Sequence, residues 1–432
     1  MKKTHNKLSR DLRDFLDLSP TPFHATEQLS KMLMSGGYEK LHEEKEWILK
    51  KGGRYFVVRN DSSLIAFVMG HSDPLKYGLR IAGAHTDSPC LMIKPNPDIT
   101  KNGYLQLGVE VYGGALLNPW FDRDLSIAGR IIFQKSSGEL EAKLIDFKRA
   151  VAIIPSLAIH LDRDANKNRS VNAQTDIPPI LMRTKNKQNF RQLLEKNFLS
   201  MGEKVLDYEL SFYDFQKASN IGINGEFLVS ARLDNLLSCY VAAKAISASD
   251  GEHNCVLVCS DHEEIGSVSS SGSDGPFLES ILERMVGNDL VRDRVMRRSL
   301  FISCDSAHAM HPNYKSMHDD RHQPIINEGP VIKVNAKQRY ATNSITSSIF
   351  KKICSDASIP LQTFVSRSDI GCGSTIGPIV SARLGIPTLD VGIPQLAMHS
   401  CRETAGVRDP NFLEKGLIKF FDYQEPLAIT NQ

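Results

Sequence analysis

Near its start the chain repeats leucine and phenylalanine at the three- and four-residue spacing of an amphipathic helix, which predicts a helix from Leu8 to about Leu18. A second helix is expected to follow the Ser-Pro-Thr-Pro turn that ends at Pro22 and to stop at Gly36. Short apolar runs then predict three strands, at residues 55–58, 64–69 and 79–84.

The pattern changes between residues 95 and 224, where β-like runs such as 105–111 and 127–133 are separated by Gly, Asn and Pro turns. After residue 228, strands alternate with helices. The predicted strands lie at 256–260, 300–304, 331–334, 361–365 and 387–391, and the predicted helices at 234–246, 345–357 and 376–384. Such alternation favours an α/β sheet covered by helices on both faces.

These two patterns predict a discontinuous domain architecture. Residues 1–94 and 225–432 would form one α/β catalytic domain, and residues 95–224 a β-rich insertion. A chain of 432 residues is long enough for two or three domains.

Composition narrows the class of protein. The chain is 41% hydrophobic, and its 52 basic and 50 acidic residues are mixed along the sequence, so neither nucleic acid nor a membrane surface is an expected partner. No apolar run reaches the roughly 18 residues of a membrane helix, and no apolar segment follows the basic start as in a secretion signal. The eight cysteines contain no CxxC pair, which favours a reduced, cytoplasmic location.

Histidines and carboxylates gather at the ends of predicted strands. They are His85 and Asp87 after 79–84, Asp234 at the start of 234–246, Glu263 and Glu264 after 256–260, Asp305 after 300–304, and His399 beyond the last strand. In open α/β sheets the carboxyl ends of strands bring distant residues together, so we expect these groups at one edge of one sheet. Imidazole and carboxylate ligands suit zinc or related divalent ions, and a two-metal hydrolytic site needs about five or six of them.

Each piece taken alone has an ordinary structural interpretation. A His-x-Asp sequence is commonly a surface turn, and the adjacent Glu263 and Glu264 are typical of a solvated face. Asp234 and Asp305 could each cap the helix that follows a strand. The combination at one predicted sheet edge is what favours a metal site.

Longer motifs around these residues resemble the aspartyl aminopeptidase family of co-catalytic zinc exopeptidases. The similarity extends over essentially the whole chain. It is carried by GAHTDSP at 83–89, ARLDN at 231–235, DHEEIGS at 261–267, DSAHAMHPNY at 305–314, GPVIKVN at 329–335, GCGSTIGP at 371–378 and PQLAMHS at 394–400. The resemblance implies a zinc-exopeptidase-like mixed sheet with helices on both faces, plus an inserted β-rich domain.

The resemblance also implies two divalent metal ions per subunit, with zinc the expected metal. Asp234 would bridge both ions, His85 and Asp305 would complete one site, and Glu264 and His399 the other. Asp87 would orient the His85 imidazole, and Glu263 would act as the general base that takes a proton from the attacking water.

Four further residues match substrate positions of the family, each with an ordinary alternative. His308 is otherwise a packed loop histidine, and Lys333, with Tyr340 nearby in sequence, is otherwise a solvated strand lysine. His160, in the insertion, would reach the active site of a neighbouring subunit or else be a satisfied core histidine. The family forms homo-oligomeric shells, with a dodecamer as one candidate assembly, so the insertion is expected to serve oligomerisation and active-site closure.

The sequence therefore predicts a metallo-aminopeptidase that releases N-terminal residues, preferably Asp or Glu, from peptides. Two enzymatic alternatives use the same scaffold, namely a neutral-residue aminopeptidase and an acyl-amino-acid deacylase or dipeptidase. A non-catalytic assembly module is the alternative from another class, and the intact set of predicted ligands argues against it.

Overall fold

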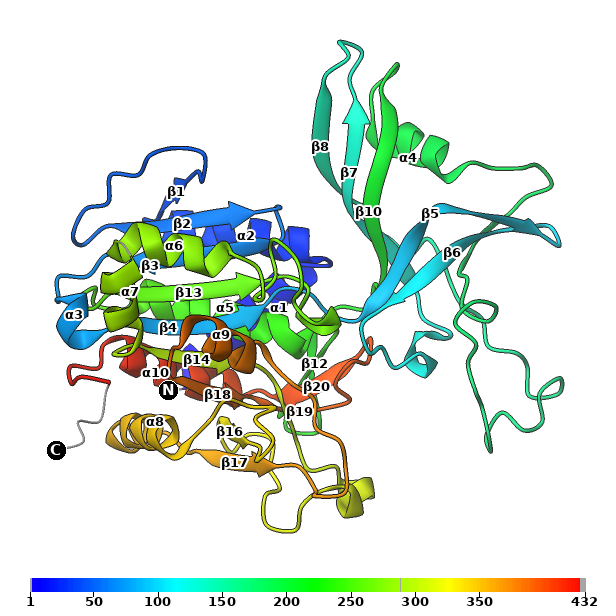
Figure 1. The fold of residues 1–432 in the computed structure, drawn as a ribbon. Coiled ribbons are helices and arrows are strands. Elements are labelled where there is room, and N and C mark those ends of the chain that lie inside the picture. The colour runs from blue at the N-terminus through cyan, green and yellow to red at the C-terminus, as the bar shows by residue number, and fades with distance from the viewer. Residues whose placement is uncertain (1, 288, 428–432) are drawn as a thin grey trace. The chain divides into compact units, whose positions relative to one another are not determined.

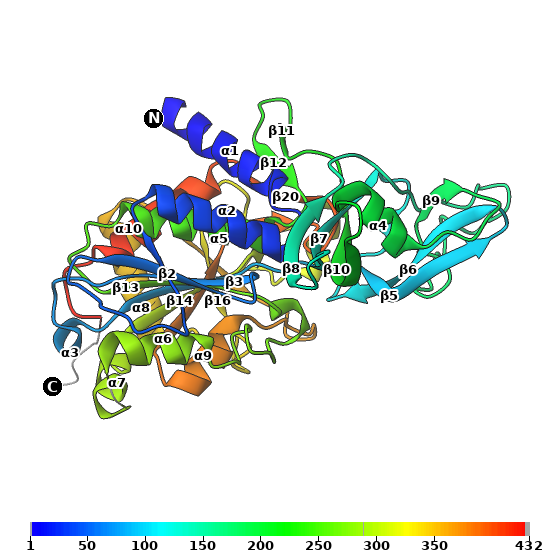
Figure 2. The ribbon, with the colours of Figure 1, turned by 90° about the horizontal axis from the view of Figure 1, so that it is seen from above.

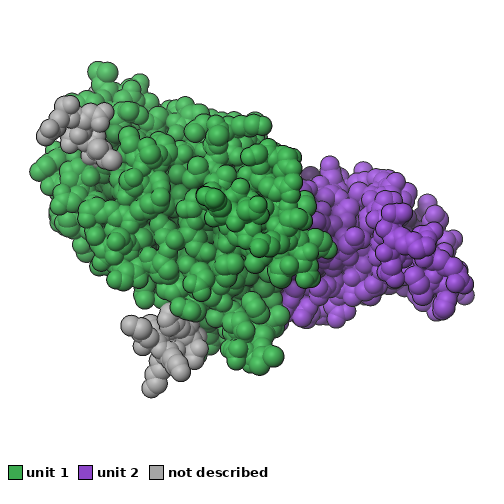
Figure 3. Space-filling view, turned by 90° about the horizontal axis from the view of Figure 1, so that it is seen from below, with its two compact units in different colours: residues 1–87, 218–398, 403–432 green, residues 88–217, 399–402 purple. Residues whose placement is uncertain are grey.

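The computed structural model describes residues 2–287 and 289–427, and the chain divides into two compact units (Figure 3). Unit 1 comprises residues 1–87, 218–398 and 403–432. Unit 2 comprises residues 88–217 and 399–402. Among the described residues, unit 1 contains two sheets and unit 2 contains one, and the hydrophobic cores of the two units are separate.

Unit 1 is built on a nine-stranded mixed sheet within the described residues (Figure 1). Its strands are, in spatial order, β1 (Glu39–Leu41), β2 (Arg54–Arg59), β3 (Ser63–Val68), β13 (Cys255–Ser260), β4 (Arg80–His85), β14 (Leu300–Cys304), β18 (Thr388–Gly392), β16 (Val331–Val334) and β17 (Gln362–Val365). The central strands β13, β4, β14 and β18 are parallel, whereas β3 and β16 run antiparallel to their central neighbours.

Alternating side chains of the central strands serve two cores, one on each face of this sheet. In β13, Leu257 packs into one core and its neighbours Val256 and Val258 into the other. The first core is covered by α1 (Lys2–Asp17), α2 (Pro22–Ser35), α5 (Leu233–Ala248), α8 (Ser344–Asp356) and α10 (Asp409–Phe421). The second is covered by α6 (Phe277–Val286), α7 (Asp289–Met296) and α9 (Ile376–Leu384), as Figure 2 shows. A short helix, α3 (Pro74–Tyr77), precedes β4.

A smaller five-stranded sheet also belongs to unit 1. Its order is β11 (Ser219–Ile221), β12 (Phe227–Ser230), β20 (Glu403–Gly406), β19 (Pro394–Leu396) and β15 (Ala307–His308). Strand β12 leads into α5, and β15 follows β14 closely in sequence. This sheet therefore connects segments that carry several of the predicted site residues.

Unit 2 contains a six-stranded antiparallel sheet and one α-helix, α4 (Phe190–Phe198), among its described residues. The strands are, in spatial order, β8 (Leu140–Asp146), β7 (Leu125–Gln134), β10 (Lys204–Asp214), β5 (Cys90–Lys101), β6 (Tyr104–Tyr112) and β9 (Ile180–Arg183). This unit begins earlier than the boundary read from the sequence because β5 starts at Cys90, and it ends earlier because β11 pairs within unit 1.

The mixed sheet, its two helical layers and the additional β-rich unit confirm the expected fold class. No helix in the described part of the chain is long and apolar enough to cross a membrane.

Candidate metal centre

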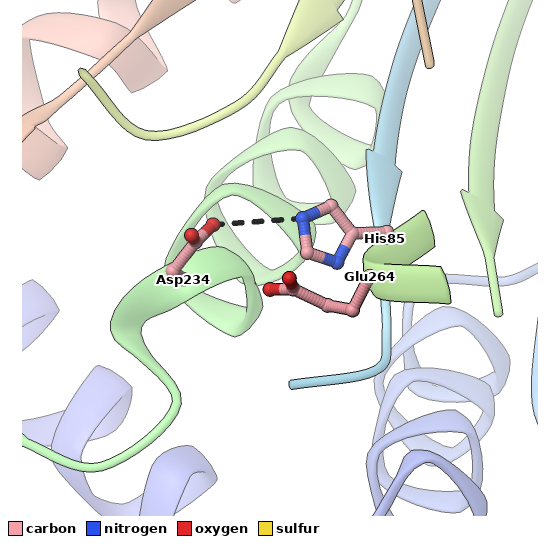
Figure 4. A group of neighbouring side chains, drawn as sticks. All are labelled: His85, Asp234 and Glu264. Carbon is pink, nitrogen blue, oxygen red and sulfur yellow. Dashed lines mark ion pairs between the residues drawn. The ribbon is translucent and has the colours of Figure 1, made fainter. Parts of the chain in front are cut away.

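Three side chains of unit 1 converge to form a candidate metal site. One ligand atom from each of His85, Asp234 and Glu264 lies within 4.8 Å of the others (Figure 4). His85 is the last residue of β4, Asp234 lies at the start of α5, and Glu264 lies in the 3-10 turn Glu263–Ile265 after β13. His85 Nε2 is 3.5 Å from Asp234 Oδ1, and both side chains are buried.

The parallel strands of the large sheet explain part of this arrangement. Residues Ser260 of β13 and His85 of β4 are register partners, so the turn carrying Glu263 and Glu264 begins beside His85. Strand β14 ends one residue before Asp305, whose Oδ1 is 3.9 Å from His85 Nε2. The N–H of Asp305 donates to the Val391 carbonyl at 3.0 Å.

The expectation that all five ligands lie at one edge of one sheet was wrong for two of them. Asp234 and His399 follow β12 and β19, which belong to the five-stranded sheet. The regular part of the helix predicted from residue 234 begins later than expected, because Asp234 and Asn235 have non-helical dihedral angles. The strand–helix pattern of the sequence does not distinguish between strands of two different sheets.

Asp87 connects the histidine to the two glutamates. Its Oδ1 lies 3.3 Å from His85 Nδ1 and accepts the backbone N–H of Glu263 at 3.1 Å. Its Oδ2 accepts the backbone N–H of Glu264, also at 3.1 Å. The backbone carbonyl of Asp87 also contacts His85 Nδ1, at 3.1 Å. This one buried residue thus holds the imidazole ring and, through its carboxylate, the turn that presents the glutamates.

Four hydrogen bonds hold the Asp234 segment. Glu403 Oε2 accepts the backbone N–H of Asp234 at 2.9 Å, and Asn235 Nδ2 donates to the Cys304 carbonyl at 2.7 Å. Arg232, which has a positive φ of 60°, donates to the carbonyls of Leu16 and Ser19. Sequence reasoning did not single out Glu403 or Asn235. An acidic residue four positions after His399, within a strand, was a signal that could have identified Glu403.

The protein groups in this cluster carry an excess of negative charge. Burial raises the pKa of Glu263 to about 8; His85 opposes the shift, while Asp305 and Asp87 add to it. Burial likewise raises the pKa of Asp305 to about 6, against the opposing effect of Lys333. Burial lowers the pKa of His85, but hydrogen bonds with Asp234 and Asp87 outweigh it and hold that pKa well above its ordinary value. A buried imidazole among buried carboxylates is a donor set that fits zinc.

Lys333 is buried beside this cluster, so its interpretation as a solvated strand lysine was wrong. The side chain is 2% exposed, and its Nζ donates to the Ser306 carbonyl at 3.1 Å. The same ammonium lies 3.6 Å from Asp305 Oδ2 and 5.0 Å from the centre of the Tyr340 ring. Burial raises the pKa of the Tyr340 phenol, so this ring stays neutral beside the cation.

The remaining predicted residues lie in other settings. His308, on β15, is exposed, and its ring lies 5.7 Å from that of Phe364. His160 is exposed in unit 2, so its interpretation as a core histidine was wrong. His399 also belongs to unit 2, where its Nδ1 lies 3.2 Å from the Gly114 carbonyl oxygen. The ligand role of His399 and the substrate role of His160 stay predictions.

The family model described as aminopeptidase I zinc metalloprotease (M18) matches residues 15–421. The chain belongs to the M18 family of zinc aminopeptidases. A probable M18 family aminopeptidase 2 from Pseudomonas paraeruginosa is 53% identical over 425 residues, which cover 97% of this chain and 99% of the relative. A similar protein from Pseudomonas fluorescens is 53% identical over 423 residues, covering 96% of this chain and 98% of that relative.

Solved M18 structures share the fold. A cryo-EM structure of an Ape4 and Nbr1 complex contains a chain that aligns with a TM-score of 0.92 and 39% identity, covering 97% of this chain and 86% of that one. The structure of the S. cerevisiae mApe1 dodecamer aligns with a TM-score of 0.83 and 26% identity, covering 96% of both chains. The enzyme is therefore a zinc aminopeptidase, in agreement with the donor set around His85.

Proposed function

We propose that this M18 aminopeptidase hydrolyses the first peptide bond of peptides with two zinc ions, held by His85, Asp234, Glu264, Asp305 and His399. The observation that carries the proposal is the convergence of the buried His85 and Asp234 with the half-buried Glu264, whose ligand atoms lie within 4.8 Å of one another. Asp305 extends this group, because its Oδ1 lies 3.9 Å from His85 Nε2. When bound, such ions polarise a scissile carbonyl and lower the pKa of water from 15.7 to about 7.

Glu263 is the proposed general base. It is adjacent to Glu264 but is not one of the three converging ligands, which leaves its carboxylate available to accept a proton from water. Burial and the neighbouring carboxylates raise its pKa to about 8. Positive charge placed among these carboxylates lowers that pKa and favours the ionised form that a base requires.

Asp87 would keep this arrangement in place during the reaction. Its contacts with the His85 ring and with the N–H groups of Glu263 and Glu264 orient a ligand and the base together. Such partners of metal ligands fix the ring orientation and raise the basicity of the imidazole.

We also propose a preference for Asp or Glu as the first residue of the peptide. The five carboxylates Asp87, Asp234, Glu263, Glu264 and Asp305 would repel an acidic side chain. Two divalent ions and the Lys333 ammonium together carry as much positive charge as these carboxylates carry negative charge. Lys333 is buried next to Asp305, where a charge acts in a low dielectric and has a stronger effect than in water.

Hydrolysis of a substrate panel tests these proposals. Metal-loaded protein would be assayed with peptides beginning with Asp, Glu, Leu or Lys, with dipeptides and with acyl amino acids. The proposal expects the highest kcat/KM for Asp- and Glu-peptides. Efficient cleavage of Leu-peptides alone would support a neutral-residue aminopeptidase, and cleavage of acyl amino acids or of dipeptides only would support a deacylase or a dipeptidase.

Removal of metal tests the mechanism. Chelation followed by dialysis should abolish hydrolysis, and added Zn²⁺ should restore it, with elemental analysis giving two ions per subunit at full activity. Full activity at one ion per subunit would contradict the two-metal proposal. Zinc-loaded protein that is inactive on the whole panel would instead support a non-catalytic assembly module.

We propose that the enzyme forms a homo-oligomeric shell through unit 2. The S. cerevisiae mApe1 relative is a dodecamer. In this chain the segment around His160 exposes the aliphatic side chains of Leu157, Ile159 and Leu161, the last of them 75% exposed. Clustered exposed aliphatic residues are typical of protein interfaces. In such an assembly His160 would reach the active site of a neighbouring subunit and help to close it.

A cytoplasmic location is the final part of the proposal. All eight cysteines lie within the described residues, and all are free thiols. Free thiols persist in reducing compartments, whereas disulfides form in oxidising ones.

A further inference from the structure

Glu403 is a buried carboxylate with a direct contact to the candidate metal centre. It is the first residue of β20 and is 1% exposed. In the register of the five-stranded sheet it pairs with Ser230, the last residue of the strand that leads into α5. Its Oε2 reaches the backbone N–H of Asp234 at 2.9 Å.

A carboxylate is unfavourable at this position, because the side chains around it are mostly apolar and buried. Two residues further along β20, Ala405 is fully buried and belongs to the first hydrophobic core of unit 1. Burying a charged group away from water costs free energy unless hydrogen bonds compensate for it. The hydrogen bond that Glu403 accepts from the Asp234 backbone gives a reason for a glutamate in this strand.

The backbone that Glu403 holds is irregular. Asp234 has φ −82° and ψ 105°, and Asn235 has φ −127° and ψ 26°, although both fall inside α5. The first N–H groups of a helix have no partner within the helix, so an outside acceptor is needed. Glu403 supplies that acceptor for the N–H of Asp234. The side chain of the same Asp234 points to His85, with its Oδ1 3.5 Å from His85 Nε2.

We propose that Glu403 is a positioning residue of the candidate metal centre: it fixes the Asp234 backbone and thereby the Asp234 carboxylate, which would be a metal ligand. The inference rests on the proposed function, because that function makes Asp234 a ligand. Asp87 acts in the same way on the turn after β13, where it accepts the N–H groups of Glu263 and Glu264. The two ligand-bearing turns are thus held by two separate buried carboxylates.

Near-isosteric variants of the full-length protein separate the hydrogen bond from packing. Glu403→Met keeps the length of the side chain and removes the acceptor, whereas Glu403→Gln retains one. Zn²⁺ affinity would be measured by competition with a chromogenic chelator, and ligand geometry by the visible spectrum of the Co²⁺ form. Glu403→Met is expected to weaken Zn²⁺ binding about 10–100-fold and to change the Co²⁺ spectrum, and Glu403→Gln to restore most of both.

Asp409 provides a matched control. It is also fully buried and accepts backbone N–H groups, from Asn327 at 2.7 Å and Gly329 at 3.0 Å, but it belongs to another loop. Asp409→Leu should lower thermal stability without changing Zn²⁺ affinity or the Co²⁺ spectrum. If Glu403→Met does not fold, Glu403→Asp replaces it, because the shorter side chain withdraws the acceptor while keeping the charge.

The results distinguish this inference from the proposed function. Parental Zn²⁺ affinity in Glu403→Met or Glu403→Asp, with thermal stability lowered as in Asp409→Leu, would overturn the positioning role. His85→Ala should weaken Zn²⁺ binding whatever Glu403 does. If His85→Ala bound Zn²⁺ as the parent does, the metal centre itself, and with it the inference, would be wrong.

Discussion

The Lys333 ammonium lies 3.6 Å from Asp305 Oδ2, and both side chains are buried. The other oxygen of Asp305 is the one closest to His85 Nε2, at 3.9 Å. Asp305 therefore lies between a fixed cation and the candidate metal centre. Lys333 influences that centre through Asp305 as well as through its own charge.

Lys333→Met should lower kcat/KM for every peptide and lower it most for Asp-peptides. Truncating one member of a buried charge pair typically costs about 2–5 kcal/mol, and the missing positive charge adds a penalty for acidic substrates. Steady-state kinetics with Asp- and Leu-peptides would measure both effects. Lys352→Met is the control, because Lys352 pairs with Asp356 on the exposed face of α8. An equal loss for both peptides would show that Lys333 acts only through Asp305.

Glu263→Gln and Glu264→Gln should have different effects although the residues are adjacent. Glu264 is one of the three converging ligand residues and Glu263 is not. Glu263→Gln should retain zinc and lose about 10²–10⁴-fold in kcat, because the amide keeps the shape but cannot accept the proton. Glu264→Gln should lose zinc affinity. Elemental analysis beside kcat measures both, and equal zinc loss in the two variants would contradict the assignment of roles.

Asp87→Ala should weaken zinc binding and activity together, by about 10–100-fold. The substitution removes the carboxylate beside the His85 ring, which keeps only the backbone carbonyl of residue 87, and leaves the N–H groups of Glu263 and Glu264 without their acceptor. Zinc titration and kcat/KM would be compared with those of Asp98→Ala, since Asp98 accepts the N–H of Phe190 in unit 2. The prediction fails if zinc affinity stays at the parental value.

His160→Ala should lower activity without unfolding the protein. His160 is exposed, so its removal leaves no cavity in a core. Leu161→Asp should instead shift the protein to smaller assemblies, because a charge would replace a side chain that is 75% exposed and proposed to lie at an interface. Light scattering, circular dichroism and peptide hydrolysis measure these effects. A fully active monomeric parent protein would contradict both expectations.

His253 should make stability depend on pH below neutrality. Burial lowers its pKa to about 4 and Arg80 contributes in the same direction, whereas an unfolded histidine titrates near 6.5. Between these values the unfolded chain binds a proton that the folded chain does not. The stabilisation from neutral His253 is therefore complete above about pH 6.5 and decreases as the pH falls to about 4.

Urea unfolding midpoints between pH 7.5 and 4.5 test this expectation. His253→Gln keeps a polar group near Ser72, whose hydroxyl lies 3.0 Å from His253 Nδ1. The variant should lose less stability than the parent as the pH falls. Parallel curves for the two proteins would show that His253 does not titrate differently in the folded and unfolded states.

The large sheet could be predicted from sequence because its central strands are buried on both faces. Such strands appear as continuous apolar runs, as in CVLVCS for β13 and LFISC for β14. Their carboxyl ends carry His85, Glu264 and Asp305, so strand prediction also located most of the candidate ligands.

Other elements left a weaker signal. The five-stranded sheet consists of strands of two to four residues, which are too short for a clear period of hydrophobicity. Helix α6 follows a long loop, α7 comes directly after α6 without a strand between them, and α10 lies near the end of the chain, so the alternation of strands with helices did not indicate them. Because β12 is one of these short strands, the sequence did not predict that it leads into Asp234.

The sequence by itself determined the chemistry, because the histidines and carboxylates and their places after strands are properties of the chain order. Only the tertiary structure decided which groups contact one another. Glu403 meets Asp234 across 169 positions, and Asp87 meets Glu263 across 176. The burial of Lys333 against Asp305 likewise depends on how β16 is placed in the sheet. These contacts arise from strand register and loop path, and a local pattern of hydrophobic and polar residues does not encode either over such separations.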